Sequence, residues 1–171
     1  MGMGDLKVAE SRQSAELHQT ILDACSAALS NEENQANCSG FVKDTASKLS
    51  IKVGTTDNRQ ANDIFDEIDS SPWIPLGTGH AAAVKAAYYA LEGFFVIAAW
   101  RNDSGNGHVA VVTDLVGLQN RGAVSDRNVA ASWGVLNNAD LAQENGPIRE
   151  SFGSGKREHV KYAAQFINKF K

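Results

Sequence analysis

Two residues of this chain stand out because their side chains could form a nucleophile and its base. Cys38 lies in the segment NCSGFV, after the polar stretch SNEENQA, and His108 opens the apolar run HVAVVTDL directly after a glycine. A cysteine attacks as its thiolate, so it needs an imidazole nearby to take its proton. Residues far apart in sequence can supply such a pair where a helix start meets a strand start. From spacing alone, a buried helix thiol and an ordinary strand-edge histidine explain the pattern equally well.

The other cysteine and the other histidines have simpler explanations. Cys25 falls on an apolar stripe with helical spacing, so we expect a small buried side chain. His18 and His159 lie among polar residues and are expected to be solvated. His80 follows GTG at a predicted helix start, where the helix dipole disfavours an imidazolium, so a capping or loop role is expected.

The elements that would position Cys38 and His108 follow from periodicity and turn residues. Predicted helices cover about 13–29, a segment that starts near Cys38 with Asn37 as its N-cap, 61–68 and 80–93. β-Branched and aromatic runs predict a hairpin of 94–100 and 108–115 and a further strand at 128–135. Turns and loops are predicted at 30–37, 70–79 and 139–156, and 158–170 fits a helix and a strand equally well.

Length and composition limit the class of protein. We expect 1–171 to form a single domain, with 1–14 flexible or partly left over from cloning. The longest apolar run, 93–100, is too short to cross a bilayer, so no membrane role is expected. A net charge of -4 without clusters of Lys or Arg argues against a nucleic-acid partner. Zinc-ligand spacings and phosphate-binding glycine loops are missing from the sequence, so no metal or other cofactor is expected.

The motifs around both candidate residues resemble those of a known family. NCSGFV and GHVAVV, with GFFVIAAW leading into the second, are similar to the helix start and strand start of the NlpC/P60 and CHAP group of papain-like amidases. The likeness is closest to the amidase effectors of type VI secretion and covers about 15–115. It implies an α+β, papain-like NlpC/P60-type fold, with N-terminal helices packed on a small antiparallel sheet.

The resemblance also implies roles for individual residues. Cys38 would be the nucleophile and His108 the general base and then acid, while Ser39 and Gly40 match the motif beside the nucleophile. The backbone N–H of Cys38 could contribute to an oxyanion hole. The group that orients the imidazole stays open, and the weak candidates are Ser132, Asp126 and Asn120.

A biological role follows from the same resemblance. The implied activity is hydrolysis of peptidoglycan stem peptides at the bond between γ-D-glutamate and meso-diaminopimelate. The chain shows no Sec-type signal, which suits synthesis in the bacterial cytoplasm and delivery as a toxin to the periplasm of a rival cell. A cognate immunity protein is an expected partner, and the enzyme is expected to be a monomer. The alternatives are a phage or housekeeping cell-wall hydrolase of the same group, or a catalytically silent module that binds peptidoglycan or a protein.

Overall fold

The fold is built on one mixed α/β scaffold with a six-stranded sheet at its centre. The computed structural model describes residues 2–54, 60–118 and 122–168, without the side chains of 5–9. All neighbouring strands are antiparallel, and their order is β1-β6-β2-β3-β4-β5. The strands are β1 (Ile74–Thr78), β2 (Phe94–Trp100), β3 (His108–Leu115), β4 (Val129–Trp133), β5 (Gln143–Pro147) and β6 (Lys161–Phe166).

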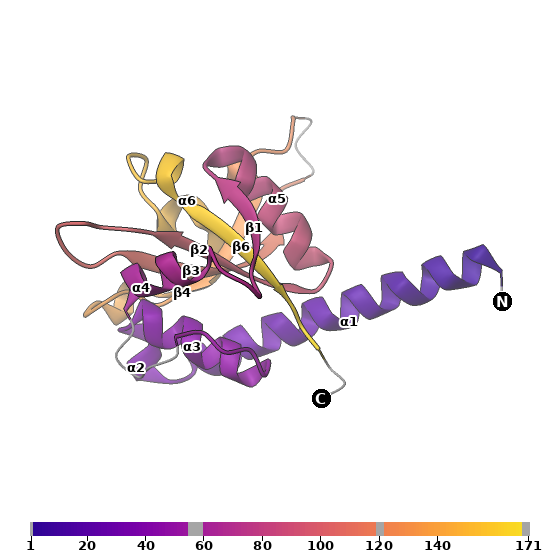
Figure 1. Cartoon of the computed structure of the whole chain (residues 1–171), viewed down its shortest axis with the longest axis horizontal. Coiled ribbons are helices and arrows are strands. Elements are labelled where there is room, and N and C mark those ends of the chain that lie inside the picture. Colours follow the sequence, from indigo (N-terminus) through magenta and orange to yellow (C-terminus); the bar gives the residue numbers. More distant parts are fainter. Residues whose placement is uncertain (1, 55–59, 119–121, 169–171) are drawn as a thin grey trace.

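Helices cover both faces of this sheet (Figure 1). One face carries α1 (Met3–Leu29), α3 (Cys38–Lys48) and α4 (Ala61–Glu67), with the short α2 (Glu32–Gln35) between α1 and α3. The other face carries α5 (His80–Leu91). Figure 1 also shows the N-terminal half of α1 reaching beyond the body of the domain. The remaining short elements are η1 (Asp126–Asn128), η2 (Ala139–Leu141), α6 (Ile148–Ser151) and η3 (Arg157–His159).

Successive side chains of β2 and β3 point to opposite faces of the sheet, so the interior consists of two cores. The first core lies between the sheet and α1, α3 and α4, and its residues on this hairpin are Phe95, Ile97, Ala99, Val109 and Val111. The second core lies between the sheet and α5, and its buried residues on the same hairpin are Val96, Ala98, Ala110, Val112 and Leu115. Because both faces are covered, FFVIAAW is a continuous apolar run rather than an alternating one. The alanines of α5 allow that helix to pack close to the sheet.

The predicted hairpin is confirmed, and it places His108 at one end of the sheet. β2 and β3 pair from Val96 opposite Val112 to Trp100 opposite His108. The ambiguous C-terminal segment is a strand, because β6 inserts between β1 and β2 and buries both of its faces. This pairing depends on partners far away in sequence, which explains why local periodicity could not distinguish helix from strand.

Three segments differ from the sequence-based expectation. The predicted turn region 70–79 contains β1, an edge strand whose pairing with β6 is interrupted between Pro75 and Gly77. The predicted loop region 139–156 contains β5 and α6, and β5 pairs with β4. The helix predicted from about 13 begins at Met3. Short edge elements bury little apolar surface, so they leave a weak pattern in the sequence.

Two further features bear on the class of protein. Among the described residues, no helix combines the length and apolarity needed to cross a bilayer. Within the same residues, no three side chains of His, Cys, Asp or Glu gather closely enough to hold a metal ion.

Candidate active site

The start of α3 is held by a cap and by close packing. Asn37 is extended, and its side-chain oxygen accepts a hydrogen bond from the backbone N–H of Gly40 at 2.9 Å, which confirms the predicted N-cap. A Cβ at position 40 would come within 3.0 Å of the Asn37 side chain and 3.3 Å of the Asn34 side chain. Gly40 therefore permits close packing against the cap and α2.

Asn34 joins the three N-terminal helices beneath the candidate nucleophile. Its amide nitrogen donates to the carbonyl of Ala28 at 2.9 Å and to the carboxylate of Asp44 at 2.8 Å. The chain after β4 passes against α2 as well, since a Cβ at Gly134 would lie 2.0 Å from the carbonyl oxygen of Asn34. These contacts fix the direction in which α3 begins.

The sulfur of Cys38 lies in a buried site that is lined by backbone N–H groups. The residue is 4% exposed, and the backbone N–H groups of Val109, Ser39 and Cys38 itself lie close enough to the sulfur to affect its pKa. Burial raises the pKa of the Cys38 thiol, and these three donors and the Ser39 hydroxyl oppose the rise. Ser39 is buried too, with its oxygen 4.0 Å from the sulfur. The thiol is therefore protonated at rest, and the nearby donors limit how strongly burial disfavours its thiolate.

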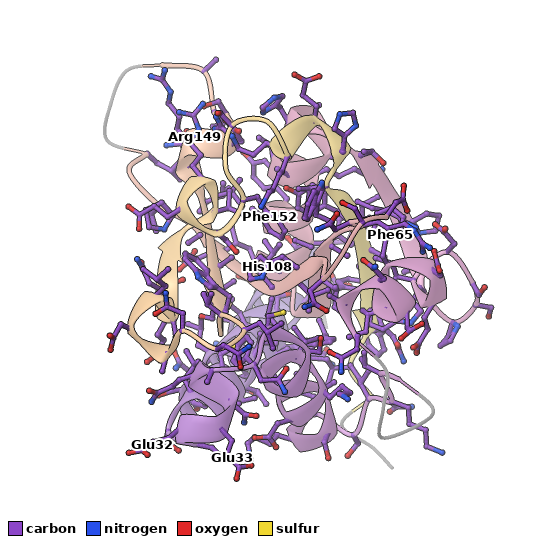
Figure 2. The ribbon with its side chains drawn as sticks, turned by 90° about the vertical axis from the view of Figure 1, so that its left-hand side faces the viewer. Glu32, Glu33, Phe65, His108, Arg149 and Phe152 are labelled. Atoms are coloured by element: carbon purple, nitrogen blue, oxygen red, sulfur yellow. The ribbon has the colours of Figure 1, made fainter. Side chains whose placement is uncertain are left out.

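His108 is held by residues of the C-terminal segment. Its Nε2 lies 2.8 Å from the hydroxyl oxygen of Ser151, and its ring stacks edge-on against Phe152 with centroids 5.0 Å apart. Figure 2 shows Phe152 beside His108, on the ribbon that follows α6. Burial, and then the positive charge of Lys156, lower the pKa of His108 to about 4. The imidazole is therefore neutral at physiological pH, with Nδ1 as the nitrogen that faces away from Ser151.

Cys38 and His108 both lie near the start of β3. One of the backbone N–H groups near the sulfur belongs to Val109, the residue after His108. Cys38 belongs to the first core and Phe152, which packs on the imidazole, to the second. Within the described part of the chain no hydrogen bond joins the thiol and the imidazole. At rest, the site therefore holds a neutral thiol and a neutral imidazole near the same end of β3.

The loop that leads into His108 is tied to α4. Asn62 donates from its amide to the carbonyls of Asn102 and Gly105 and accepts from the backbone N–H of Asn102, at 2.9 to 3.1 Å. A Cβ at Gly107 would lie 2.4 Å from the carbonyl oxygen of Trp100 and 2.5 Å from the Asn62 side chain. The glycine before His108 is therefore required for the close approach of this loop to α4.

The structure places the weak candidates for the orienting group as follows. The Ser132 hydroxyl accepts from the backbone N–H of Asn145 at 2.8 Å and hydrogen-bonds Cys25, so it lies in the neighbourhood of the other cysteine. Asp126 is buried at the start of η1, where it pairs with His80 and two arginines. Asn120 lies outside the described residues. The side chain that contacts the imidazole is instead that of Ser151.

Ser151 was missed because its position depends on tertiary structure. It ends α6, in a segment whose polar, glycine-containing sequence predicts a surface loop. The pairing of β5 with β4 returns the chain to the sheet and carries α6 to His108. A lone serine in such a segment gives no local signal of this contact.

Two of the remaining histidines also have partners that the sequence did not reveal. His80 lies 2.7 Å from Asp126, whose carboxylate also meets Arg149 at 3.2 Å and Arg157 at 3.4 Å. Burial raises the pKa of Asp126, but the hydrogen bond with His80 and the charges of both arginines bring it below its usual value. His18, which was predicted to be solvated, is half-buried with Nε2 2.7 Å from the carbonyl of Thr113. Both contacts join elements that are distant in sequence, so they stabilise the fold around the sheet.

Comparison with known proteins gives one informative relative. No family model matches the chain. A segment of 101 residues is 38% identical to the peptidoglycan amidase Tse1 of Pseudomonas aeruginosa. The match covers 56% of this chain and 60% of that protein. The chain is therefore similar to a peptidoglycan amidase over somewhat more than half of each sequence.

Proposed function

We propose that this protein is a cysteine amidase that hydrolyses peptide bonds of bacterial peptidoglycan. The observation that carries the proposal is the position of Cys38, a buried thiol at a capped helix start, close to the backbone N–H of Val109 on the strand that opens with His108. Backbone donors directed at one atom in a water-poor site stabilise the negative charge that forms during acyl transfer. The identity to a peptidoglycan amidase supports the same substrate class.

In the first half of the proposed reaction, Nδ1 of His108 takes the proton of the Cys38 thiol, directly or through one water. The sulfur attacks the carbonyl carbon of the scissile amide, and the carbonyl oxygen becomes an oxyanion near the N–H groups of the α3 start. Substrate-free enzymes often show long distances between catalytic groups that shorten on binding, so the gap between thiol and imidazole is compatible with this step.

In the second half, the imidazolium gives its proton to the leaving nitrogen, the C–N bond breaks and a thioester remains on Cys38. His108 then takes a proton from water, the resulting hydroxide attacks the thioester, and the proton returns to the sulfur as the acid is released. Ser151 acts as a positioning residue. By accepting a hydrogen bond from Nε2–H, its hydroxyl keeps Nδ1 unprotonated and ready to act as the base.

The finer assignments rest on sequence motifs. We infer a papain-like NlpC/P60 or CHAP-type site with Ser39 and Gly40 as supporting residues. We also infer cleavage between γ-D-glutamate and meso-diaminopimelate. In this proposal the protein is a monomeric antibacterial toxin, made in the cytoplasm and delivered by type VI secretion to the periplasm of the target cell. An immunity protein protects the producer.

The activity is tested by incubating purified sacculi with the wild-type chain and with Cys38→Ala, His108→Ala and Cys25→Ala variants. Mass spectrometry of the soluble products identifies the bond that is cut. Loss of the nucleophile should abolish release, and loss of the general base should lower it by about 10²- to 10⁴-fold. The Cys25→Ala control should retain it, because Cys25 packs in the first core away from the imidazole. Undiminished release by Cys38→Ala would refute the cysteine mechanism.

One observation favours a second candidate, a silent module that binds peptidoglycan or a protein without cleaving it. Among the described residues, the side chains of Cys38 and His108 are not hydrogen-bonded to each other, and burial keeps the thiol protonated. A silent module would bind sacculi in a pull-down assay and release no fragments, and Cys38→Ala would bind equally well. An active enzyme would release fragments that only the Cys38→Ala variant fails to produce.

A further inference from the structure

One ammonium group at the rim of the candidate site has no acidic partner in the described part of the chain. Lys156 is exposed, and its Nζ lies 4.4 Å from the ring centroid of Trp100. The nearby cations Arg149 and Arg157 both pair with Asp126, and Lys161 pairs with Asp69 at 2.6 Å. Lys156 thus differs from its neighbours in holding its charge over an aromatic face instead of a carboxylate.

The position of Lys156 relates its charge to the reacting groups. Trp100 is directly opposite His108 in the β2–β3 pair. Lys156 also belongs to the turn that follows Phe152, the residue stacked on the imidazole. Because its Nζ lies over the ring of Trp100, whose side chain is on the same face of the sheet as that of His108, the ammonium lies near the imidazole, and its charge contributes to the lowered pKa of His108. An ammonium placed there is available to a ligand whose reacting carbonyl lies between Cys38 and His108.

We propose that Lys156, supported by the face of Trp100, binds a free carboxylate of the substrate next to the scissile bond and thereby selects stem peptides that carry that charge. The proposal rests on the proposed function. If the cleaved bond follows γ-linked D-glutamate, the carboxylate is the α-carboxylate of that residue, a few bonds from the scissile carbonyl. Amidation of this group to D-isoglutamine removes the charge that Lys156 would recognise. An exposed lysine that is held on an aromatic ring has less side-chain freedom to lose when it binds an anion.

Two synthetic tripeptides test the proposal, one with D-glutamate and one with D-isoglutamine at the central position, each followed by meso-diaminopimelate. The wild-type chain should cleave the acid with a kcat/KM about twofold to fivefold above that of the amide. Lys156→Met should remove most of this preference by lowering kcat/KM for the acid towards the value for the amide, whereas Lys156→Arg should keep part of the preference. Lys85→Met removes an exposed lysine from α5 and should behave as wild type.

A binding measurement separates failure of this proposal from failure of the proposed function. In the Cys38→Ala background, calorimetry should show tighter binding of the acid than of the amide, and adding Lys156→Met should remove the difference. If the wild-type chain cleaves neither peptide and the Cys38→Ala variant binds neither, both proposals fall. If it cleaves both peptides equally, or if Lys156→Met keeps the preference for the acid, the carboxylate assignment is wrong while the amidase stands.

Discussion

The two cysteines of this chain occupy buried sites of opposite character. Cys25 lies within α1 and is 1% exposed, and burial followed by the charge of Glu144 raises its pKa to about 12. Cys38 is almost as buried, yet it lies at a helix start where three backbone N–H groups counteract the rise in its pKa. Burial alone therefore does not distinguish a structural thiol from a candidate nucleophile. The difference is made by the donors around the sulfur and by the nearby imidazole.

The largest expected effect is on the pH dependence of kcat/KM, which is set by His108, the imidazole near Cys38. His108 stays unprotonated until the pH falls towards its pKa of about 4. At pH 5 the wild-type chain should therefore retain most of its kcat/KM, about thirtyfold more than a base of ordinary pKa near 6.5 would allow. The pH profile of stem-peptide hydrolysis measures this, and an acid limb near 6.5 would contradict the lowered pKa.

The same shift has a consequence for stability. The folded pKa of His108 lies below its unfolded value, so the unfolded chain binds a proton that the folded chain excludes between pH 6.5 and 4. The contribution of His108 to the free energy of unfolding is present above pH 6.5 and is lost as the pH falls towards 4. Urea denaturation at several pH values should show a smaller decrease over this range for His108→Gln than for wild type.

The next effect concerns the reactivity of the two thiols. Each pKa is raised, but Cys38 has three backbone donors and Cys25 has only the side chains of Ser132 and Thr45. In the folded single-cysteine variants, iodoacetamide should modify Cys38 at least about tenfold faster than Cys25, with a rate that rises steeply above neutral pH. Intact-mass spectrometry follows both reactions. Equal rates would mean that the α3 start does not activate its thiol.

A smaller effect should separate the serines near the two sites. Ser151 contacts His108, while Ser132 contacts Cys25 and Asn145. Ser151→Ala should lower kcat by about threefold to tenfold, corresponding to one hydrogen bond of about 1 kcal/mol, with little change in KM. It should also alter the acid limb of the pH profile. Ser132→Ala is the matched control, and if it lowers kcat as much, Ser151 has no special role.

The smallest expected effect is the change in the free energy of unfolding when Cys25 is replaced. Cys25→Ala should lower the free energy of unfolding by about 1 kcal/mol, because it leaves a small cavity in the first core. Chemical denaturation provides the value, and hydrolysis by the folded variant should equal that of wild type. A folded Cys25→Ala variant without activity would place Cys25 in the catalytic machinery and end the distinction between the two thiols.

The parts of the fold that could be predicted are those with strong local patterns. The helix cap at Asn37, the buried stripe that contains Cys25 and the hairpin that ends at His108 all depend on residues within a few positions of one another. The strands β1, β5 and β6 could not be assigned in the same way, because short or edge strands are defined mainly by their pairing partners. The contacts of His18 and His80 could not be predicted either, because their partners are distant in sequence.

The sequence by itself determined the two ends of the candidate site, Cys38 and His108, since a capped helix start and a strand start both have local signatures. Only the tertiary structure decided what surrounds them. It brought Ser151, Phe152 and Lys156 from the C-terminal segment to His108. It also buried Cys38 and partly buried His108, which keeps both groups neutral at rest. The reason is physical: burial and long-range contacts set protonation and orientation, and these depend on the packing of segments that are distant in the chain.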